Sequence, residues 1–464
     1  MITTYKNHFL VIIAALTVLS SCKVAQRYEG PGLSTQNLYR DANSADTTTI
    51  ADIPWRQFFN DAALQKLIQE GISNNLDLKI ALTRIQQSEA YYKQSQAAFL
   101  PGLNANANVA LNKLSDAQGG NFINNSRVYQ LGLSTSWEAD IWGKLSSSRR
   151  ASLATLLQNQ AYSRAVQTGI VATVANYYYT LLALDQQLSI TEQTVKNWMA
   201  SVETMRALKE AAVVTGAAVV QSEANRYAVE VTIPDLKQRI RETENALSIV
   251  LGRAPGPISR SNLDAQVEST VFNIGVPAQL LSNRPDVQQA EYNYRYFFES
   301  TNVARSYFYP SLTITAGGGL SNIALQDFFS SGSVFANLAG GLTQPIFNKR
   351  INKTRLEVAR AAQQEALLSF QNSLLQAGRE VSDALSDYRT GVEKNSLRSQ
   401  QLASLRKSIE FTQELLKYGS ANYTEVINAQ QSYLGAQLNR VNDRVQQLQA
   451  TVELYRALGG GWKE

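Results

Sequence analysis

The chain repeats itself once, and this duplication restricts what it can fold into. Matching residues recur 205 to 209 positions apart in the two halves. The pairs include Asn74 and Asn283, Asp77 and Asp286, Pro101 and Pro310, Leu103 and Leu312, Ile141 and Ile346, Val174 and Val381, and Gly252 and Gly459. Each copy contains only two segments with the alternation of a strand. Four strands cannot close a barrel, and an open sheet is not viable in lipid, so strands of this kind in a membrane require several chains.

The first residues have the composition of an export signal. A short apolar stretch over 9–19 leads into Leu19-Ser20-Ser21-Cys22, which resembles the lipobox of bacterial lipoproteins. We expect residues 1–21 to be removed and Cys22 to become a lipid anchor, with each buried methylene contributing roughly 0.8 kcal/mol to membrane binding. Lys23 in the next position favours the outer membrane. The alternative is a plain secretory signal followed by an incidental cysteine.

The composition excludes several classes of function. His8 is the only histidine and Cys22 the only cysteine, so the mature chain is expected to have no histidine and no free thiol. Catalytic triads with histidine, Cys/His nucleophiles, histidine metal sites and structural disulfides are therefore excluded. Three methionines argue against a thioether path for copper or silver. The net charge of +5 without a long basic run argues against nucleic acid. We predict no enzyme, no cofactor and no metal site.

Four segments alternate between apolar and polar side chains. In the first, which starts at Leu103, one face is apolar and the other carries Asn104, Asn106 and Asn108. The remaining segments start near Tyr129, Leu312 and Leu338. Alternating runs of about 10 residues are typical of membrane strands that face lipid on one side and a polar lumen on the other. A half-buried hairpin in a soluble sheet would show the same alternation and remains the alternative.

Apolar residues also recur every seven positions after each strand pair. The series are Val174, Leu181, Leu188, Val195 and Val202; Leu374, Val381, Tyr388, Asn395, Leu402, Ile409 and Leu416; and Ile427, Leu434, Val441, Leu448 and Tyr455. A sustained heptad repeat predicts left-handed coiled-coil packing. Helices over about 145–209 and 351–417 would each be roughly 100 Å long. A coiled-coil spacer or adhesin stalk would explain the heptads, but not the strands that interrupt them at two matching places.

Each copy is expected to run through a shorter helix (75–100 or 285–309), a strand pair, a long helix and a return helix. Pro101 and Pro310 end the shorter helices because proline cannot continue a helix, and Pro234 should kink the first return helix. Two chains would give eight strands, and side chains fill the interior of an eight-stranded barrel. Three chains give twelve strands, the smallest number that leaves a channel. We therefore expect an α+β membrane protein with two repeats, whose trimer forms a 12-stranded outer-membrane β-barrel continuous with a 12-helix periplasmic α-barrel.

Several motifs resemble the outer membrane efflux protein family, the TolC-like outer membrane factors, and in particular their lipoprotein branch serving resistance-nodulation-division pumps. They are Trp55-Arg56-Gln57-Phe58-Phe59, Asn75-Leu76-Asp77-Leu78, residues 137–144, Asn283-Arg284-Pro285-Asp286-Val287, Phe308-Tyr309-Pro310-Ser311-Leu312 and Gln344-Pro345-Ile346-Phe347. The resemblance extends over nearly everything from Pro54 on and divides the chain into a signal peptide (1–21), a lipidated segment (22–53) and repeats over 54–256 and 257–464. It implies a homotrimeric exit duct that receives drugs or other small solutes from an inner-membrane transporter through a periplasmic adaptor, without chemistry of its own.

The resemblance also implies where the adaptor docks. The expected site comprises both lower helical turns, Val213, Val214, Thr215 and Gly216 in the first copy and Gly419, Ser420, Ala421 and Asn422 in the second. Glu425 falls where the family often has an acidic residue, and three copies would form a cation-selective ring. A solvated carboxylate in the first turn of a helix is the alternative. Ala212 and Ala218 replace the glycine and the acid expected in the first copy, so the gate known in some members is not expected to operate residue for residue.

The sequence leaves the cargo open. A drug-export or type I secretion duct and a metal-export duct are both compatible with the family, and the lack of histidine and methionine makes metal the least favoured cargo. A surface lipoprotein that uses its coiled coil for adhesion or scaffolding is the remaining reading without transport.

Overall fold

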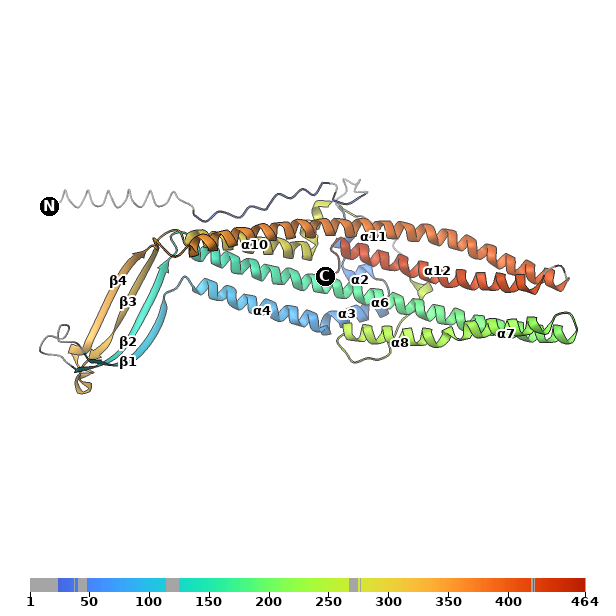
Figure 1. Cartoon of the computed structure of the whole chain (residues 1–464), viewed down its shortest axis with the longest axis horizontal. Helices are drawn as coiled ribbons and strands as arrows, with labels where there is room; N and C mark the ends of the chain where they lie inside the picture. Colours follow the sequence, from blue (N-terminus) through green and yellow to red (C-terminus); the bar gives the residue numbers. More distant parts are fainter. Residues whose placement is uncertain are drawn as a thin grey trace. The chain divides into compact units, whose positions relative to one another are not determined.

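The computed structural model describes residues 24–36, 38–40, 48–113, 125–266, 274–275, 277–418, 420 and 422–463 (Figure 1). Its helices are α2 (Trp55–Phe58), α3 (Ala62–Asn74), α4 (Leu76–Ala97), α6 (Lys144–Glu210), α7 (Gly216–Glu230), α8 (Thr232–Val250), α9 (Leu280–Asn283), α10 (Pro285–Ser306), α11 (Ile351–Lys417) and α12 (Tyr423–Ala457). Its strands are β1 (Gly102–Lys113), β2 (Asn125–Ala139), β3 (Ser311–Asn322) and β4 (Val334–Thr343). The predicted signal peptide and Cys22 lie outside the described residues.

The predicted succession of short helix, two strands, long helix and return helix is confirmed in both copies. The long helices α6 and α11 contain 67 residues each, which corresponds to roughly 100 Å of helix. Pro101 and Pro310 lie directly between a helix and a strand, where their rings end the helical hydrogen bonding. Among the described residues, no helix combines the length and the apolar composition needed to cross a bilayer.

The chain folds into two compact units. The first contains the described residues up to Gly32 together with 84–159 and 290–370, and it includes the sheet. The second contains residues 33–83, 160–289 and 371–464 as far as they are described. In the second unit, the end of α6 lies beside α7 and the end of α11 lies beside α12, so that each pair forms an antiparallel hairpin (Figure 1).

The sheet of the first unit is antiparallel with strand order β1-β2-β3-β4, so β2 and β3 join the two repeats. Asn104 pairs with Ser134, Ser134 with Gly317, and Gly317 with Asn337, which places the small polar residues of all four strands on one face. The opposite face carries large apolar side chains that stay exposed in the part of the chain that the structure describes. They include Leu103, Val109, Leu111, Leu131, Leu133, Ile314, Leu338 and Leu342. The predicted two-faced alternation is thus confirmed on all four strands, with Phe335 of β4 as an exception on the polar face.

The heptad positions form the core of the second unit. Val174, Leu181 and Val202 of α6 are buried, as are Val381 of α11 and Val441 of α12. Apolar side chains at a seven-residue spacing lie on one stripe of a helix, and neighbouring helices cover that stripe. Burial of these side chains, at roughly 25 cal/mol per Å² of apolar surface, is the main favourable term for helices of this length.

In both repeats, a glycine just after the return helix packs against the backbone of an asparagine at the end of an earlier helix. Gly252 and Gly459 both have left-handed backbones, with φ of 70° and 97°. A Cβ atom at Gly252 would collide with the carbonyl group of Asn74, and one at Gly459 would collide with that of Asn283. Only glycine permits both the positive φ and this close backbone approach. The duplication seen in the sequence is therefore present as the same packing contact in both copies.

The residue after each of these asparagines makes an equivalent hydrogen bond. The Asn75 amide donates to the carbonyl oxygen of Val250 at 2.8 Å. In the second copy, Nη1 of Arg284 donates to the carbonyl oxygen of Ala457 at 3.0 Å. Both bonds satisfy a carbonyl group at a helix C-terminus that has no partner within its own helix.

The first return helix is interrupted where Pro234 predicts a kink. α7 ends at Glu230 and α8 begins at Thr232, with Val231 between them. Pro234 has no N–H group to donate to the carbonyl of Glu230, four residues earlier, so the helical hydrogen bonding is broken at this point. The second return helix, α12, has Val441 at the equivalent position and is continuous.

Asp61 is the centre of a polar cluster that ties the segment between the repeats to the helices. One carboxylate oxygen accepts from the N–H of Ala63 at the start of α3. The other accepts from the Tyr178 hydroxyl at 2.7 Å, the Gln266 amide at 2.8 Å and the Ser261 hydroxyl at 2.5 Å. Burial alone would raise the pKa of Asp61, but these donors outweigh it and hold the pKa below its ordinary value.

This cluster should make the free energy of unfolding decrease at low pH. Because the pKa of Asp61 is lower in the folded than in the unfolded chain, its stabilising effect is complete above the unfolded value near 4. The effect is lost as the pH falls through the folded value. We expect the urea midpoint to decrease below about pH 4 in the natural protein and to change less over this range in Asp61→Asn. Equal losses in both proteins would exclude this carboxylate as the source.

Candidate functional site

The first hairpin turns between α6 and α7 at a strained residue. Ala212 has a φ of 58°, in the left-handed region that favours glycine. Its N–H donates to the carbonyl of Lys209 at 3.0 Å, and the N–H of Val213 donates to the carbonyl of Leu208 at 2.9 Å. These two hydrogen bonds define a Schellman motif, in which glycine usually stands where Ala212 is. The first turn thus keeps the geometry of a glycine turn without the glycine.

Ala212→Gly should therefore tighten this turn. The left-handed conformation costs an alanine roughly 1–2 kcal/mol, which glycine avoids, but the greater freedom of glycine in the unfolded chain offsets part of this gain. We expect a net local gain of about 0.5–1 kcal/mol, which would slow amide hydrogen exchange in the last turn of α6 by about two- to fivefold. Ala211→Gly, one residue earlier, is the control and should accelerate exchange there. A faster exchange in Ala212→Gly would contradict the assignment of strain.

The structure leaves the predicted docking residues of the first turn accessible. Val213 is 66% exposed and Val214 is half-buried. Thr215 precedes α7 as its N-cap without a side-chain hydrogen bond, and Gly216 is the first residue of that helix. An exposed apolar side chain next to two small polar or flexible residues is a surface on which a partner helix can pack.

The second hairpin turns between α11 and α12. The N–H of Ser420 donates to the carbonyl of Leu415 at 2.9 Å, which is the longer-range bond of a Schellman motif. The Asn422 side chain caps α12 by accepting from the N–H of Thr424. Gly419 and Ala421, which we predicted as docking residues, lie outside the described residues. Glu425 is exposed in the first turn of α12 and forms no ion pair with any described residue.

Two side-chain links join the helices close to these turns. Arg206 of α6 forms an ion pair with Glu223 of α7 at 2.6 Å within the first hairpin. Between the hairpins, the hydroxyl of Ser222 donates to the hydroxyl of Tyr423 at 2.9 Å. Burial raises the pKa of Tyr423, so this hydroxyl stays neutral across the physiological range. The link between Ser222 and Tyr423 has no signal in the sequence, because neither residue breaks the helical pattern.

A second hairpin-to-hairpin contact lies further from the turns. The amide of Gln431 donates to the side-chain oxygen of Asn225 at 3.1 Å. The contacts between the hairpins at Ser222 and at Asn225 both involve uncharged groups, each contributing about 0.5–1.5 kcal/mol.

The polar face of the sheet contains one aromatic residue that the strand pattern did not single out. The ring of Phe335 on β4 lies over Gly132 of β2. If Gly132 carried a Cβ atom, that atom would be 3.4 Å from Cζ of Phe335. Gly132 and Gly319 face each other across β2 and β3, so neither strand presents a side chain beneath the ring. The glycines of the sheet therefore provide room for a single large side chain on its polar face.

Among the described residues, no cluster of three or more His, Cys, Asp or Glu residues could hold a metal ion. The chemical groups at the two turns are amides, hydroxyls, short apolar side chains and one exposed carboxylate. Such groups can bind and orient a partner or line a passage.

The comparisons with known proteins identify the family. The model of the outer membrane efflux protein family matches the chain twice, over residues 67–253 and 276–460. The chain is 28% identical to the cation efflux system protein CusC of Escherichia coli over 459 residues, covering 96% of this chain and 97% of CusC. It is also 28% identical to the antibiotic efflux pump outer membrane protein ArpC of Pseudomonas putida over 466 residues, covering 96% and 94%.

The solved structure of the outer-membrane channel OprN has the same fold, with a TM-score of 0.89 at 23% identity over 96% of this chain and all of OprN. Together with the two matches to the family model, this agreement extends over both repeats. The chain belongs to the outer membrane efflux protein family and is an outer-membrane component of an efflux system.

Proposed function

We propose that three copies of this chain assemble into one continuous exit duct. The observation that carries the proposal is the sheet, which has an exposed apolar face and two edge strands, β1 and β4, that pair with no further strand among the described residues. Pairing β4 of each copy with β1 of the next removes every edge, as lipid requires. Three copies of a four-stranded sheet supply twelve strands, and the face with Asn104 and Asn337 then lines a polar lumen.

The two helical turns are the proposed docking surface for a periplasmic adaptor, which connects the duct to an inner-membrane transporter of the resistance-nodulation-division class. Val213 supports this role, because an apolar side chain that is two-thirds exposed at the end of a helical hairpin gains free energy when a partner covers it. Val214, Thr215 and Gly216 extend the surface in the first copy, and Ser420 and Asn422 in the second.

The lipid anchor at Cys22 is proposed from the lipobox and from the packing of the residues that follow it. The backbone N–H and C=O groups of Gln26 bond to the amide side chain of Asn302 on α10, at 3.1 and 2.9 Å. Tyr28 packs edge-on against Phe298, with ring centroids 5.4 Å apart. Four residues reach at most about 14 Å, so an acyl chain on Cys22 would be held close to the sheet end of α10.

Small organic solutes are the proposed cargo, and their passage through the duct is passive. The relatives include one named for cation efflux and one named for antibiotic efflux at the same identity, so similarity does not distinguish the two cargo classes. The composition makes metal ions the less favoured cargo, because the only histidine lies within the predicted signal peptide and only three methionines are present. Soft or imidazole ligands are what copper and related metals require along a path.

Single-channel conductance of the detergent-purified protein, measured together with its mass, tests this function. We expect a trimer that conducts, and Glu425→Ala should reduce its preference for cations by roughly half or more, because a carboxylate ring attracts cations. Glu393→Ala removes an exposed carboxylate far from the turn and should leave the selectivity unchanged. A trimer with the same selectivity in both variants would exclude the ring but keep the duct. A monomer without conductance would contradict the duct and favour the scaffold.

A further inference from the structure

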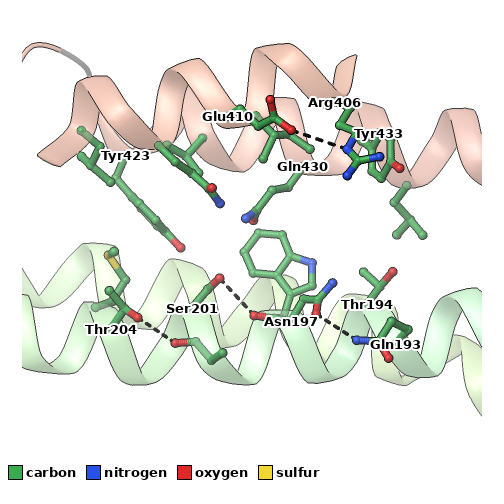
Figure 2. Close-up of a pocket in the computed structure, with 18 of the residues that line it drawn as sticks. Gln193, Thr194, Asn197, Ser201, Thr204, Arg406, Glu410, Tyr423, Gln430 and Tyr433 are labelled. Carbon is green, nitrogen blue, oxygen red and sulfur yellow. Dashed lines mark hydrogen bonds and ion pairs between the residues drawn. The ribbon is translucent and has the colours of Figure 1, made fainter. Parts of the chain in front are cut away.

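The second unit contains a cavity of about 1130 Å³ between α6 and the hairpin of α11 and α12. Figure 2 shows Tyr423 and Gln430 reaching from α12 toward α6, opposite Ser201 and Thr204. We call this space the α6–α12 cavity. Its volume is slightly above the range of about 300–1,000 Å³ that is usual for small-molecule sites. It lies within a single chain, and so its ligand chemistry can be derived from the residues described here.

One part of the lining is apolar and aromatic. Trp198 and Met205 of α6 and Val426 of α12 reach the cavity although each is almost completely buried. Tyr423 and Tyr433 add two more rings. Aromatic and thioether groups interact favourably with aromatic ligands beyond the effect of apolar burial. This part of the cavity therefore favours a planar ring over a flexible chain.

The polar groups of the lining fall into two sets. The α6 hydroxyls are committed to their own helix, since those of Thr194, Ser201 and Thr204 donate to carbonyl groups one turn earlier at 2.8, 3.1 and 2.9 Å. The side-chain amides of Gln430 and Gln437 on α12 are half-buried and make no hydrogen bond within the described residues. A half-buried amide without a partner gains free energy from a ligand that supplies one.

The cavity has no net charge. Arg406 and Glu410 are the two charged residues in its lining, and they pair with each other at 3.5 Å on α11. Both side chains are largely exposed (75% and 61%), so the desolvating part of the cavity is the part lined by Trp198, Met205 and Val426, where a charged ligand would meet no opposite charge. The lining therefore favours a neutral ligand over an ion.

We propose that the α6–α12 cavity binds a neutral, planar aromatic molecule that carries hydroxyl or amide groups. Its ring lies beside Trp198 and Tyr433, and its polar groups bond to Gln430 and Gln437. The lining also includes Val213 and Val214 of the proposed docking surface, but binding of this ligand requires neither conduction nor a bound adaptor.

Equilibrium dialysis of the full-length protein in detergent tests the site with 4-nitrophenyl β-D-glucoside, a neutral, water-soluble nitroaromatic with four hydroxyl groups. We expect saturable binding of one molecule per chain with a Kd below about 1 mM. The 4-nitrophenyl β-D-glucuronide differs mainly by its carboxylate and should bind at least about tenfold more weakly. Equal binding of both compounds, or binding that only follows the amount of detergent, would overturn the proposal.

Two variants locate the bound molecule. Gln430→Trp places a large ring in the cavity and should weaken binding at least about tenfold, while Gln430→Leu removes only the amide and should weaken it about fivefold. Ser432→Trp is the control, because Ser432 is exposed, does not line the cavity and lies on the opposite side of α12 from Gln430. Circular dichroism melting confirms that each variant is folded. A protein that conducts but binds no glucoside would overturn this site and leave the duct intact.

Discussion

Gly319→Ala is expected to prevent the sheet from forming and to abolish the trimer. A Cβ atom at Gly319 would collide with the carbonyl group of Leu131 and would lie 2.5 Å from the Cα atom of Gly132. Both atoms belong to the backbone of β2, which cannot move aside without breaking the β2–β3 pairing. Among the described strands, that pairing is the one that joins the two repeats.

Overpacking usually costs about 1–3 kcal/mol, and we expect about 3 kcal/mol or more for this substitution because neither neighbouring atom is in a flexible side chain. The loss should appear as a missing trimer band in gels run without heating and as missing conductance in planar bilayers. Both assays report on the assembled barrel, and a destabilised sheet affects them before it affects the helices of the other unit.

Gly340→Ala on β4 is the matched control. It adds the same methyl group to the same sheet, but a Cβ atom at Gly340 has no neighbour within 4 Å. Substitutions in such open positions usually change stability by less than about 0.5 kcal/mol, so this variant should assemble and conduct normally. Normal assembly of Gly319→Ala would show that β2 and β3 are further apart than described here.

Arg284→Met should lower the free energy of unfolding by about 3 kcal/mol, the second-largest effect that we expect. The guanidinium group of Arg284 is 4% exposed and pairs with Asp286 at 2.6 Å and with Glu380 at 2.9 Å. It also donates to the carbonyl group of Ala457. Burial would raise the pKa of Asp286, but the hydrogen bond and the charge of Arg284 keep it below its ordinary value.

The estimate lies at the lower end of the range for breaking a buried ion pair, because the Asp286 side chain is 46% exposed and regains water when its partner is removed. Urea unfolding followed by circular dichroism measures the effect. Arg379→Met is the control, since Arg379 pairs with Asp383 on the exposed face of α11. Such a surface pair contributes about 0.3–0.5 kcal/mol. Equal losses in the two variants would mean that Arg284 contributes no more than a surface pair.

The helices and strands were predictable from the sequence because each carries a long periodic pattern. The heptads predicted α6 and α11 to within one residue at each end, and the period of two predicted which face of each strand is apolar. Pro101, Pro310 and Pro234 marked the breaks, since the effect of proline on a helix is local. The duplication required assembly, because it limits each chain to four strands.

The individual contacts at the functional sites were not predictable in the same way. Ser222 and Tyr423 are about 200 positions apart in the sequence, and each is an ordinary residue in a helix. Phe335 was not singled out because it interrupts a polar face, and its place is explained only by Gly132 on another strand. The α6–α12 cavity depends on how three helices lie beside one another, which no single helix encodes.

The sequence by itself therefore determined the periodic and local features of this protein, namely the elements, their apolar faces, the duplication and the family. The tertiary structure alone decided which side chains meet. A periodic pattern predicts which face of a helix or strand is buried. Contacts such as that between Arg284 and Glu380 also depend on how the elements are rotated and shifted relative to each other. Those quantities are set by the sum of many packing interactions from distant parts of the chain.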